Sequence, residues 1–232
     1  MSLSDYRIIK IETPTFLNDT KNHAMYGGLR GRKGFIERFD TYECQHFDYS
    51  ETSNINTNKE QEKQQQQLLV YHDVIVGSNL CGHDGIVHGG IIAFLFDETV
   101  GWGHTIVQLR RRQQRQQQQE RSRRRHSTGN IGSGNNNSAA LLLEDLSSQP
   151  GVSANLNINF RVPLPANTLV RMKTYLVKTH KRKVYLRSTM ESIPNERSVE
   201  SSESDTEPPP STTTTILYAE ATCIMVTLTS RL

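Results

Sequence analysis

A histidine, two glycines and a later aspartate form the part of the sequence best suited to chemistry. His88, Gly89 and Gly90 end a glycine-rich stretch, and six apolar residues separate them from Asp97. If a helix begins at the glycines, its first N–H groups have no partners within the helix and carry positive partial charge. Glycine also lets the backbone approach a bound oxygen closely. The segment can therefore stabilise a developing negative charge, and Asp97 can act as a base or a nucleophile.

Neighbouring residues leave alternatives open. Glu98 competes with Asp97 for the same role, and hydrogen bonding within the loop is the alternative to catalysis for His88. His83, Asp84 and His88 share one glycine-rich loop, but they lack a third strong ligand and make a poor metal site. We therefore expect no metal and no other cofactor.

The reactive segment needs a helix to position it. Residues 91–100 would be apolar nearly all round as a helix, which must then be buried. A strand over residues 91–96 is the alternative. The glycine pair before this segment and the carboxylates near its end favour a buried helix.

Strand patterns surround this helix. Residues 151–162 alternate apolar and polar side chains, which is typical of a half-buried antiparallel strand, and Pro163 ends it. Further strands are predicted over 68–77, 168–178, 183–192 and 216–228. Residues 35–47 could form a strand or a short helix. This order predicts an α+β fold in which an antiparallel sheet wraps around one apolar helix.

Polar segments divide the chain. We expect an N-terminal extension and polar loop over residues 1–67, disordered from 51, and one domain over residues 68–229. Low-complexity insertions are expected at 105–150 and 194–215. The first contains an Arg/Gln run, residues 110–125, which we interpret as solvated and disordered.

Composition limits the partners and the compartment. The net charge is +3, but residues 105–150 hold eight arginines against three acidic residues, so the basic character belongs to one insertion. That run lacks interleaved aromatic residues, and we expect no nucleic-acid partner. Three cysteines without a C-x-x-C motif indicate a reducing compartment. No apolar run approaches the ~18 residues that span a membrane. We expect a cytoplasmic or mitochondrial protein.

The motif resembles that of a known family. His88-Gly89-Gly90, six apolar residues and Asp97, followed by the strand GVSANLNINF at 151–160, are similar to hotdog-fold thioesterases of the PaaI type, including mammalian thioesterase superfamily members. The resemblance implies a hotdog fold and hydrolysis of an acyl-CoA thioester to free acid and coenzyme A. A non-catalytic hotdog protein that binds acyl-CoA or scaffolds a complex is the alternative function.

The resemblance also implies roles for individual residues. The Gly89 amide would be the oxyanion donor, worth ~3 kcal/mol of transition-state stabilisation, and Asp97 would be the base or nucleophile. Asn79 and Ser153 would assist, although Asn79 lies further from the motif than the family Asn does. Ser153 falls on the polar face of its strand, while the helix should pack on the apolar face. Coenzyme A contacts are expected from Gly90, Lys178, Lys181, Arg182 and Lys183.

Helix geometry predicts the assembly. His88 and Asp97 are nine residues apart, which is roughly 13 Å along a helix and places them on opposite faces. One thioester carbon cannot lie within ~3.5 Å of both. If both ends of the motif act, Asp97 must come from a second subunit, so we expect a homodimer or a dimer of dimers.

Overall fold

The structure is a computed structural model that describes residues 3, 6–11, 23–46, 66–126, 151–193 and 214–228. Three predictions lie wholly or largely outside these residues. They are the polar loop expected over 51–67, of which only 66 and 67 are described, the second half of the first insertion at 127–150, and residues 194–213 of the second insertion.

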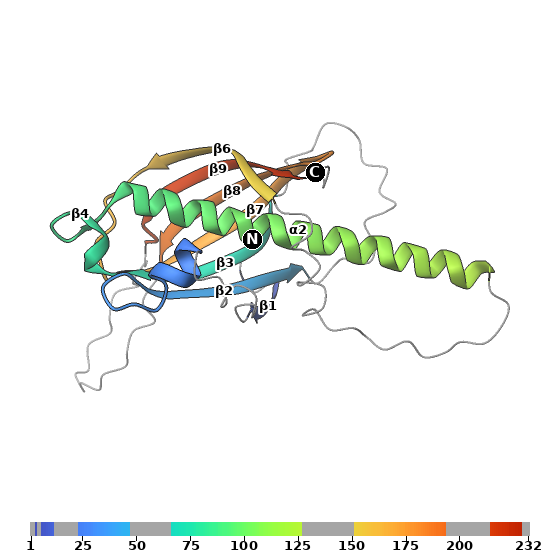
Figure 1. The fold of residues 1–232 in the computed structure, drawn as a ribbon, viewed down its shortest axis with the longest axis horizontal. Helices are drawn as coiled ribbons and strands as arrows, with labels where there is room; N and C mark the ends of the chain where they lie inside the picture. The colour runs from blue at the N-terminus through green and yellow to red at the C-terminus, as the bar shows by residue number, and fades with distance from the viewer. Residues whose placement is uncertain are drawn as a thin grey trace, which may run out of the picture.

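One antiparallel sheet dominates the fold (Figure 1). Its seven strands lie in the order β1-β2-β3-β7-β8-β9-β6, so that β1 and β6 form the two edges. The strands are β1 (Tyr6–Ile11), β2 (Ile36–His46), β3 (Gln67–Val76), β6 (Gly151–Phe160), β7 (Leu169–His180), β8 (Lys183–Ser192) and β9 (Leu217–Thr227). A separate short pair, β4 (Cys81–His83) and β5 (Ile86–Val87), leads into the helix. The strands expected from residue 68 onward are confirmed.

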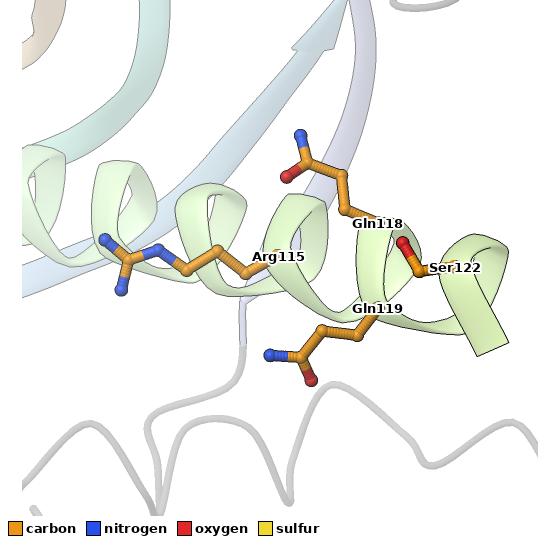
Figure 2. Close-up of a pocket in the computed structure, with 4 residues that line it drawn as sticks. All are labelled: Arg115, Gln118, Gln119 and Ser122. Atoms are coloured by element: carbon orange, nitrogen blue, oxygen red, sulfur yellow. The ribbon is translucent and has the colours of Figure 1, made fainter.

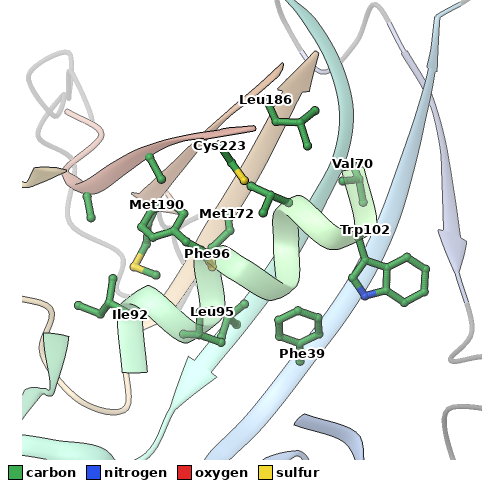
Figure 3. Packing of buried hydrophobic residues seen from close by; sticks show 14 of the residues in the cluster. Phe39, Val70, Ile92, Leu95, Phe96, Trp102, Met172, Leu186, Met190 and Cys223 are labelled. Carbon is green, nitrogen blue, oxygen red and sulfur yellow. The ribbon is translucent and has the colours of Figure 1, made fainter. Parts of the chain in front are cut away.

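A single long helix, α2 (Gly89–His126), lies along one face of the sheet (Figure 1). Ile92, Leu95, Phe96, Val100 and Ile106 are buried on it and belong to the same core cluster as side chains of β2, β3, β7, β8 and β9 (Figure 3). The segment 91–100 is thus helical and buried. Together, sheet and helix form the hotdog arrangement, so the expected fold class is confirmed. Among the described helices, none is both long and apolar enough to cross a membrane.

The Arg/Gln run corrects one expectation. We interpreted residues 110–125 as disordered, but α2 continues through them to His126 and projects past the sheet (Figure 1). Arg and Gln are good helix formers, and extending an existing helix avoids the cost of nucleating a new one. Ile106 and Val107 are also buried in the core. The domain core therefore reaches beyond residue 105, where we expected the first insertion to start.

The N-terminal region belongs to the sheet. β1 pairs with β2, and β2 pairs with β3, so the sheet begins at Tyr6 and not at the expected domain start of residue 68. The ambiguous segment 35–47 is largely the strand β2. A π-helical turn, η2 (Ala24–Leu29), precedes β2 and buries Met25 completely. A 3-10 turn, η3 (Ser78–Leu80), follows β3.

Candidate active site

One amide at the start of α2 has no hydrogen-bond partner among the residues that the structure describes. His88 is the residue before the helix, and its Nδ1 accepts the Gly90 N–H at 2.9 Å. The His88 carbonyl accepts the Ile91 N–H at 2.9 Å. Within the described residues, the Gly89 N–H donates to no protein group. Gly89 therefore offers a free donor at the positive end of the helix, and His88 caps the neighbouring amide.

An aromatic ring flanks this amide. A Cβ added at Gly89 would lie 3.6 Å from the Phe160 ring, which is an ordinary contact distance. Phe160 ends the edge strand β6, and 56% of it is exposed. The free amide thus lies between the helix start and an exposed aromatic side chain.

Asp97 and Ser153 face each other two turns further along α2. The Ser153 hydroxyl donates to Asp97 Oδ1 at 2.5 Å and also lies 3.2 Å from Met225 Sδ. Both Asp97 and Ser153 are exposed. A carboxylate held by a hydroxyl keeps its second oxygen available for a water molecule or a carbonyl carbon.

A β-bulge turns Ser153 toward the helix. The pairing of β6 with β9 shifts between Ser153, which faces Met225, and Asn155, which faces Ile224, so Ala154 is an extra residue. Ser153 therefore shares the helix-facing side with Leu156 and Ile158, which pack against the core. Our expectation that Ser153 would lie on the face away from the helix was wrong, because simple alternation assumes a strand without a bulge.

The two halves of the motif are separated within one chain. Gly89 lies beside the Phe160 ring of β6, and Asp97 contacts Ser153 of β6, so both lie on the β6 side of α2. Eight residues of helix separate them, which is about 12 Å along the axis. A single carbonyl group is too small to contact both groups of the same protomer.

Glu98 points to a different part of the fold. Its Oε1 lies 4.0 Å from His23 Nε2 beside η2, and its side chain is only 17% exposed. Burial, and to a lesser degree the Asp97 charge, raises the pKa of Glu98 to about 7. The sequence alternative in which Glu98 replaces Asp97 at the motif is not favoured by this position, because it is Asp97 that contacts Ser153.

Asn79 lies apart from these groups. Its N–H donates to the Gly34 carbonyl at 2.7 Å, and a Cβ on Gly34 would lie 2.5 Å from Asn79 Nδ2. Among the residues that the structure describes, no hydrogen bond joins Asn79 to Gly89 or Asp97. Its position is explained by packing of η3 on the turn before β2.

The basic hairpin between β7 and β8 lies at the Ser153 end of β6. Lys183 pairs with Val226, which pairs in turn with Val152. Lys181 occupies the turn with a positive φ of 53°, and Lys178 Nζ lies 4.7 Å from the Tyr185 ring centroid. By this strand pairing, the hairpin lies near the end of β6 whose Ser153 contacts Asp97, and far from the end of β6 beside Gly89.

A hollow of about 490 Å³ lies elsewhere, on the projecting part of α2. Figure 2 shows its lining residues, Arg115, Gln118, Gln119 and Ser122. Arg115 is 18 residues from Asp97, about 27 Å along the helix. The hollow is polar and remote from the reactive motif, so it is not part of this site.

Sequence reasoning missed two features of the site. From the sequence, Phe160 was assigned only to a strand. It is an aromatic residue at the end of the alternating apolar positions of that strand, and this could have indicated its place in the site. His23 and Tyr26, which lie against Glu98 and Trp102, gave no sequence signal because they are more than 60 residues from the motif.

Comparisons with known proteins give weak matches. No family model matches the sequence, and no curated protein matches it. Among solved structures, yhdA from Lactococcus lactis aligns at 13% identity and a TM-score of 0.41, over 72% of this chain and 92% of that one. The protein smu.793 from Streptococcus mutans UA159, solved with acetyl-CoA, aligns at 12% identity and 0.37, over 80% and 100%.

A third structure, the thioesterase superfamily protein RHA08564, aligns at 15% identity and a TM-score of 0.35, over 68% of this chain and 50% of that one. All three alignments have TM-scores below 0.5 and show nothing about the activity of this chain. The seven-stranded antiparallel sheet and the central helix α2 give this chain the hotdog fold.

Proposed function

We propose that this protein is an acyl-CoA thioesterase, which hydrolyses an acyl-CoA thioester to a free acid and coenzyme A. The observation that carries the proposal is the free Gly89 N–H at the start of α2, on the same side of the helix as the Asp97–Ser153 contact. An oxyanion donor and a carboxylate are the two groups that thioester hydrolysis requires.

The proposed site is shared between two protomers. The separation of about 12 Å between Gly89 and Asp97 favours a second copy as the source of the carboxylate. The exposed edge of β6 supports the same arrangement, since Val152 and Phe160 expose large apolar side chains there, and so does Val162, two residues after the end of the strand. An unpaired edge strand with apolar side chains is a surface that a second copy can cover. The assembly is a homodimer or a dimer of dimers.

In this mechanism, the thioester oxygen accepts the Gly89 N–H of one protomer. Asp97 of the partner subunit either takes a proton from water, which attacks the thioester carbon, or attacks that carbon directly. The tetrahedral oxyanion is stabilised by the amide and by the start of α2. Collapse of the intermediate breaks the carbon–sulfur bond. When water attacks, the proton taken up by Asp97 passes to the departing sulfur, and the free acid and the coenzyme A thiol are released. When Asp97 attacks, the acyl group stays on Asp97 as an anhydride, and a water molecule then hydrolyses this anhydride to the free acid and supplies the proton for the coenzyme A sulfur. Ser153 fixes the orientation of the carboxylate.

Coenzyme A also needs contacts away from the reacting carbon. Gly90 is exposed next to the oxyanion donor and can approach the thioester arm. The hairpin of Lys178, Lys181, Arg182 and Lys183 offers positive charge to the phosphates. Its position at the Ser153 end of β6 supports this role.

A turnover screen tests the proposal. Purified protein is incubated with acyl-CoAs of short to long chain, thiol release is followed, and molecular mass is measured on the same sample. We expect turnover of at least one chain length by a species no smaller than a dimer, and loss of turnover in Asp97→Asn with acyl-CoA binding retained. Binding without turnover in the wild type would instead support a non-catalytic acyl-CoA-binding protein.

A further inference from the structure

Glu98 is a partly buried carboxyl group that the proposed reaction does not use. It follows Asp97 directly on α2, so the two side chains point about 100° apart around the helix. Asp97 is exposed and faces Ser153, whereas the Glu98 side chain is 17% exposed. Its pKa is raised to about 7, mainly by burial. A carboxyl group with such a value next to a reactive carboxylate can change charge near neutral pH.

The surroundings of Glu98 form a compact contact between α2 and η2. Glu98 and Trp102 lie one helical turn apart. Glu98 Oε1 lies 4.0 Å from His23 Nε2, and the Trp102 Nε1–H donates to the Tyr26 hydroxyl at 2.8 Å. The His23 and Tyr26 rings are neighbours, with centroids 5.0 Å apart. These four side chains, here named the η2 clasp, attach the turn that buries Met25 to the helix that carries Asp97.

The charges that face Glu98 come from two elements. On α2 the nearest is Asp97, whose charge adds to the effect of burial on the Glu98 pKa. Beside η2, His23 faces Glu98 directly, and Tyr26 lies next to it with Arg30 at 5.5 Å from the Tyr26 ring centroid. Burial raises the pKa of Tyr26 to about 12, so the phenol stays neutral at physiological pH. The side chains that face Glu98 are therefore Asp97 on α2 and His23 beside η2, with the Arg30 charge beside the Tyr26 ring.

We infer that Glu98 is a positioning residue for Asp97, and that its ionisation acts both on the Asp97 carboxylate and on the η2 clasp. This inference rests on the proposed function for its effect on catalysis. While Glu98 is neutral, its side chain places no like charge beside Asp97. When Glu98 loses its proton, it places a like charge beside the Asp97 carboxylate, and adjacent like charges disfavour each other. The same charge faces the His23 ring, whose Nε2 lies 4.0 Å from Glu98 Oε1.

The only tryptophan of the chain gives a readout that is independent of turnover. Trp102 belongs to the η2 clasp, so its fluorescence should follow the ionisation of Glu98. In the wild type we expect an emission change with a midpoint near pH 7, which is absent in Glu98→Gln. Glu120→Gln, an exposed carboxylate on the same helix, is the matched control and should behave as the wild type. Because imidazoles ionise in a similar range, His23→Gln should keep a transition due to Glu98.

Turnover against pH gives the second readout. We expect a step of about three- to tenfold near pH 7 in the wild type and in Glu120→Gln. Glu98→Gln should lose this step and keep the lower-pH rate, because Gln resembles the neutral acid. A fluorescence transition or a turnover step that persists in Glu98→Gln overturns the inference. If the wild type hydrolyses no acyl-CoA, the proposed function fails, and the fluorescence comparison alone still supports or overturns the link between Glu98 and the clasp.

Discussion

Replacing Gly89 with proline should remove the proposed oxyanion donor and leave the fold intact. Gly89 is the first residue of α2, where proline is favoured because its missing N–H would have no helical partner. Gly89 is not among the glycines with positive φ, and the residue before the helix generally has the extended backbone that a following proline requires. The substitution therefore deletes one N–H at a position that tolerates the ring.

The expected loss follows from the chemistry of a single donor. Removal of one oxyanion-hole donor lowers kcat by about 100- to 1000-fold, or ~3 to 4 kcal/mol of transition-state stabilisation. The matched control is Gly89→Ala, which keeps the N–H and places its methyl group 3.6 Å from the Phe160 ring. We expect this control to stay within about threefold of the wild type, since that distance is an ordinary van der Waals contact.

The assay is steady-state thiol release from the preferred acyl-CoA, with thermal unfolding of each variant measured in parallel. Because the proline ring also occupies space in front of the helix start, Kd for a thioether analogue of the substrate is measured separately. A fall in kcat with Kd and Tm nearly unchanged agrees with the donor role. If Gly89→Pro and Gly89→Ala have equal turnover, the Gly89 amide does not bind the oxyanion.

Three further predictions concern Ser153, Glu98 and the buried histidines. Ser153→Ala should lower kcat about tenfold or more, because a hydrogen bond to a charged group contributes about 1.5 to 3 kcal/mol, and an unchanged kcat would show that the Asp97 contact is incidental. Glu98→Gln should stabilise the fold by up to about 3 kcal/mol at pH 8 and hardly at pH 4. Because its pKa is raised, Glu98 keeps its proton in the folded state, and the stabilisation present at low pH is lost as the pH rises through about 7. Urea unfolding at both pH values measures the stability of the variant relative to the wild type. Equal differences at pH 8 and pH 4 would refute the prediction. Burial lowers the pKa of His104 to about 4 and that of His72 to about 3, so the unfolded state binds protons first as pH falls below about 6.5. Stability should therefore fall by about 1.4 kcal/mol per pH unit for each histidine between pH 6.5 and 4, and His104→Gln should halve that loss if the two histidines dominate.

The sequence predicted those features that follow from local periodicity and residue type. Alternation over 151–160 predicted β6, and the glycine pair predicted the helix start at Gly89. A helix nearly apolar all round required a sheet to cover it, and the sheet is present. The hotdog fold could therefore be predicted from strand order and one helix.

Three features depend on the folded structure and could not be predicted from the sequence. The bulge at Ala154 reverses the face of Ser153, yet it leaves the alternating pattern unbroken in the sequence. The Arg/Gln run is helical, which we did not predict. Composition alone does not distinguish a polar helix from a disordered segment. The contact between Glu98 and His23 joins residues 75 positions apart, and no local pattern encodes it.

Mixing two inactive variants gives the most direct test of a site shared between protomers. Gly89→Pro keeps Asp97, and Asp97→Asn keeps Gly89, so a mixed dimer holds one complete site and one doubly altered site. Random exchange of equal amounts should restore about a quarter of wild-type turnover, since half of the dimers are mixed and each has one intact site in two. Turnover that stays at the level of the separate variants after subunit exchange, verified by mass, would contradict a shared site.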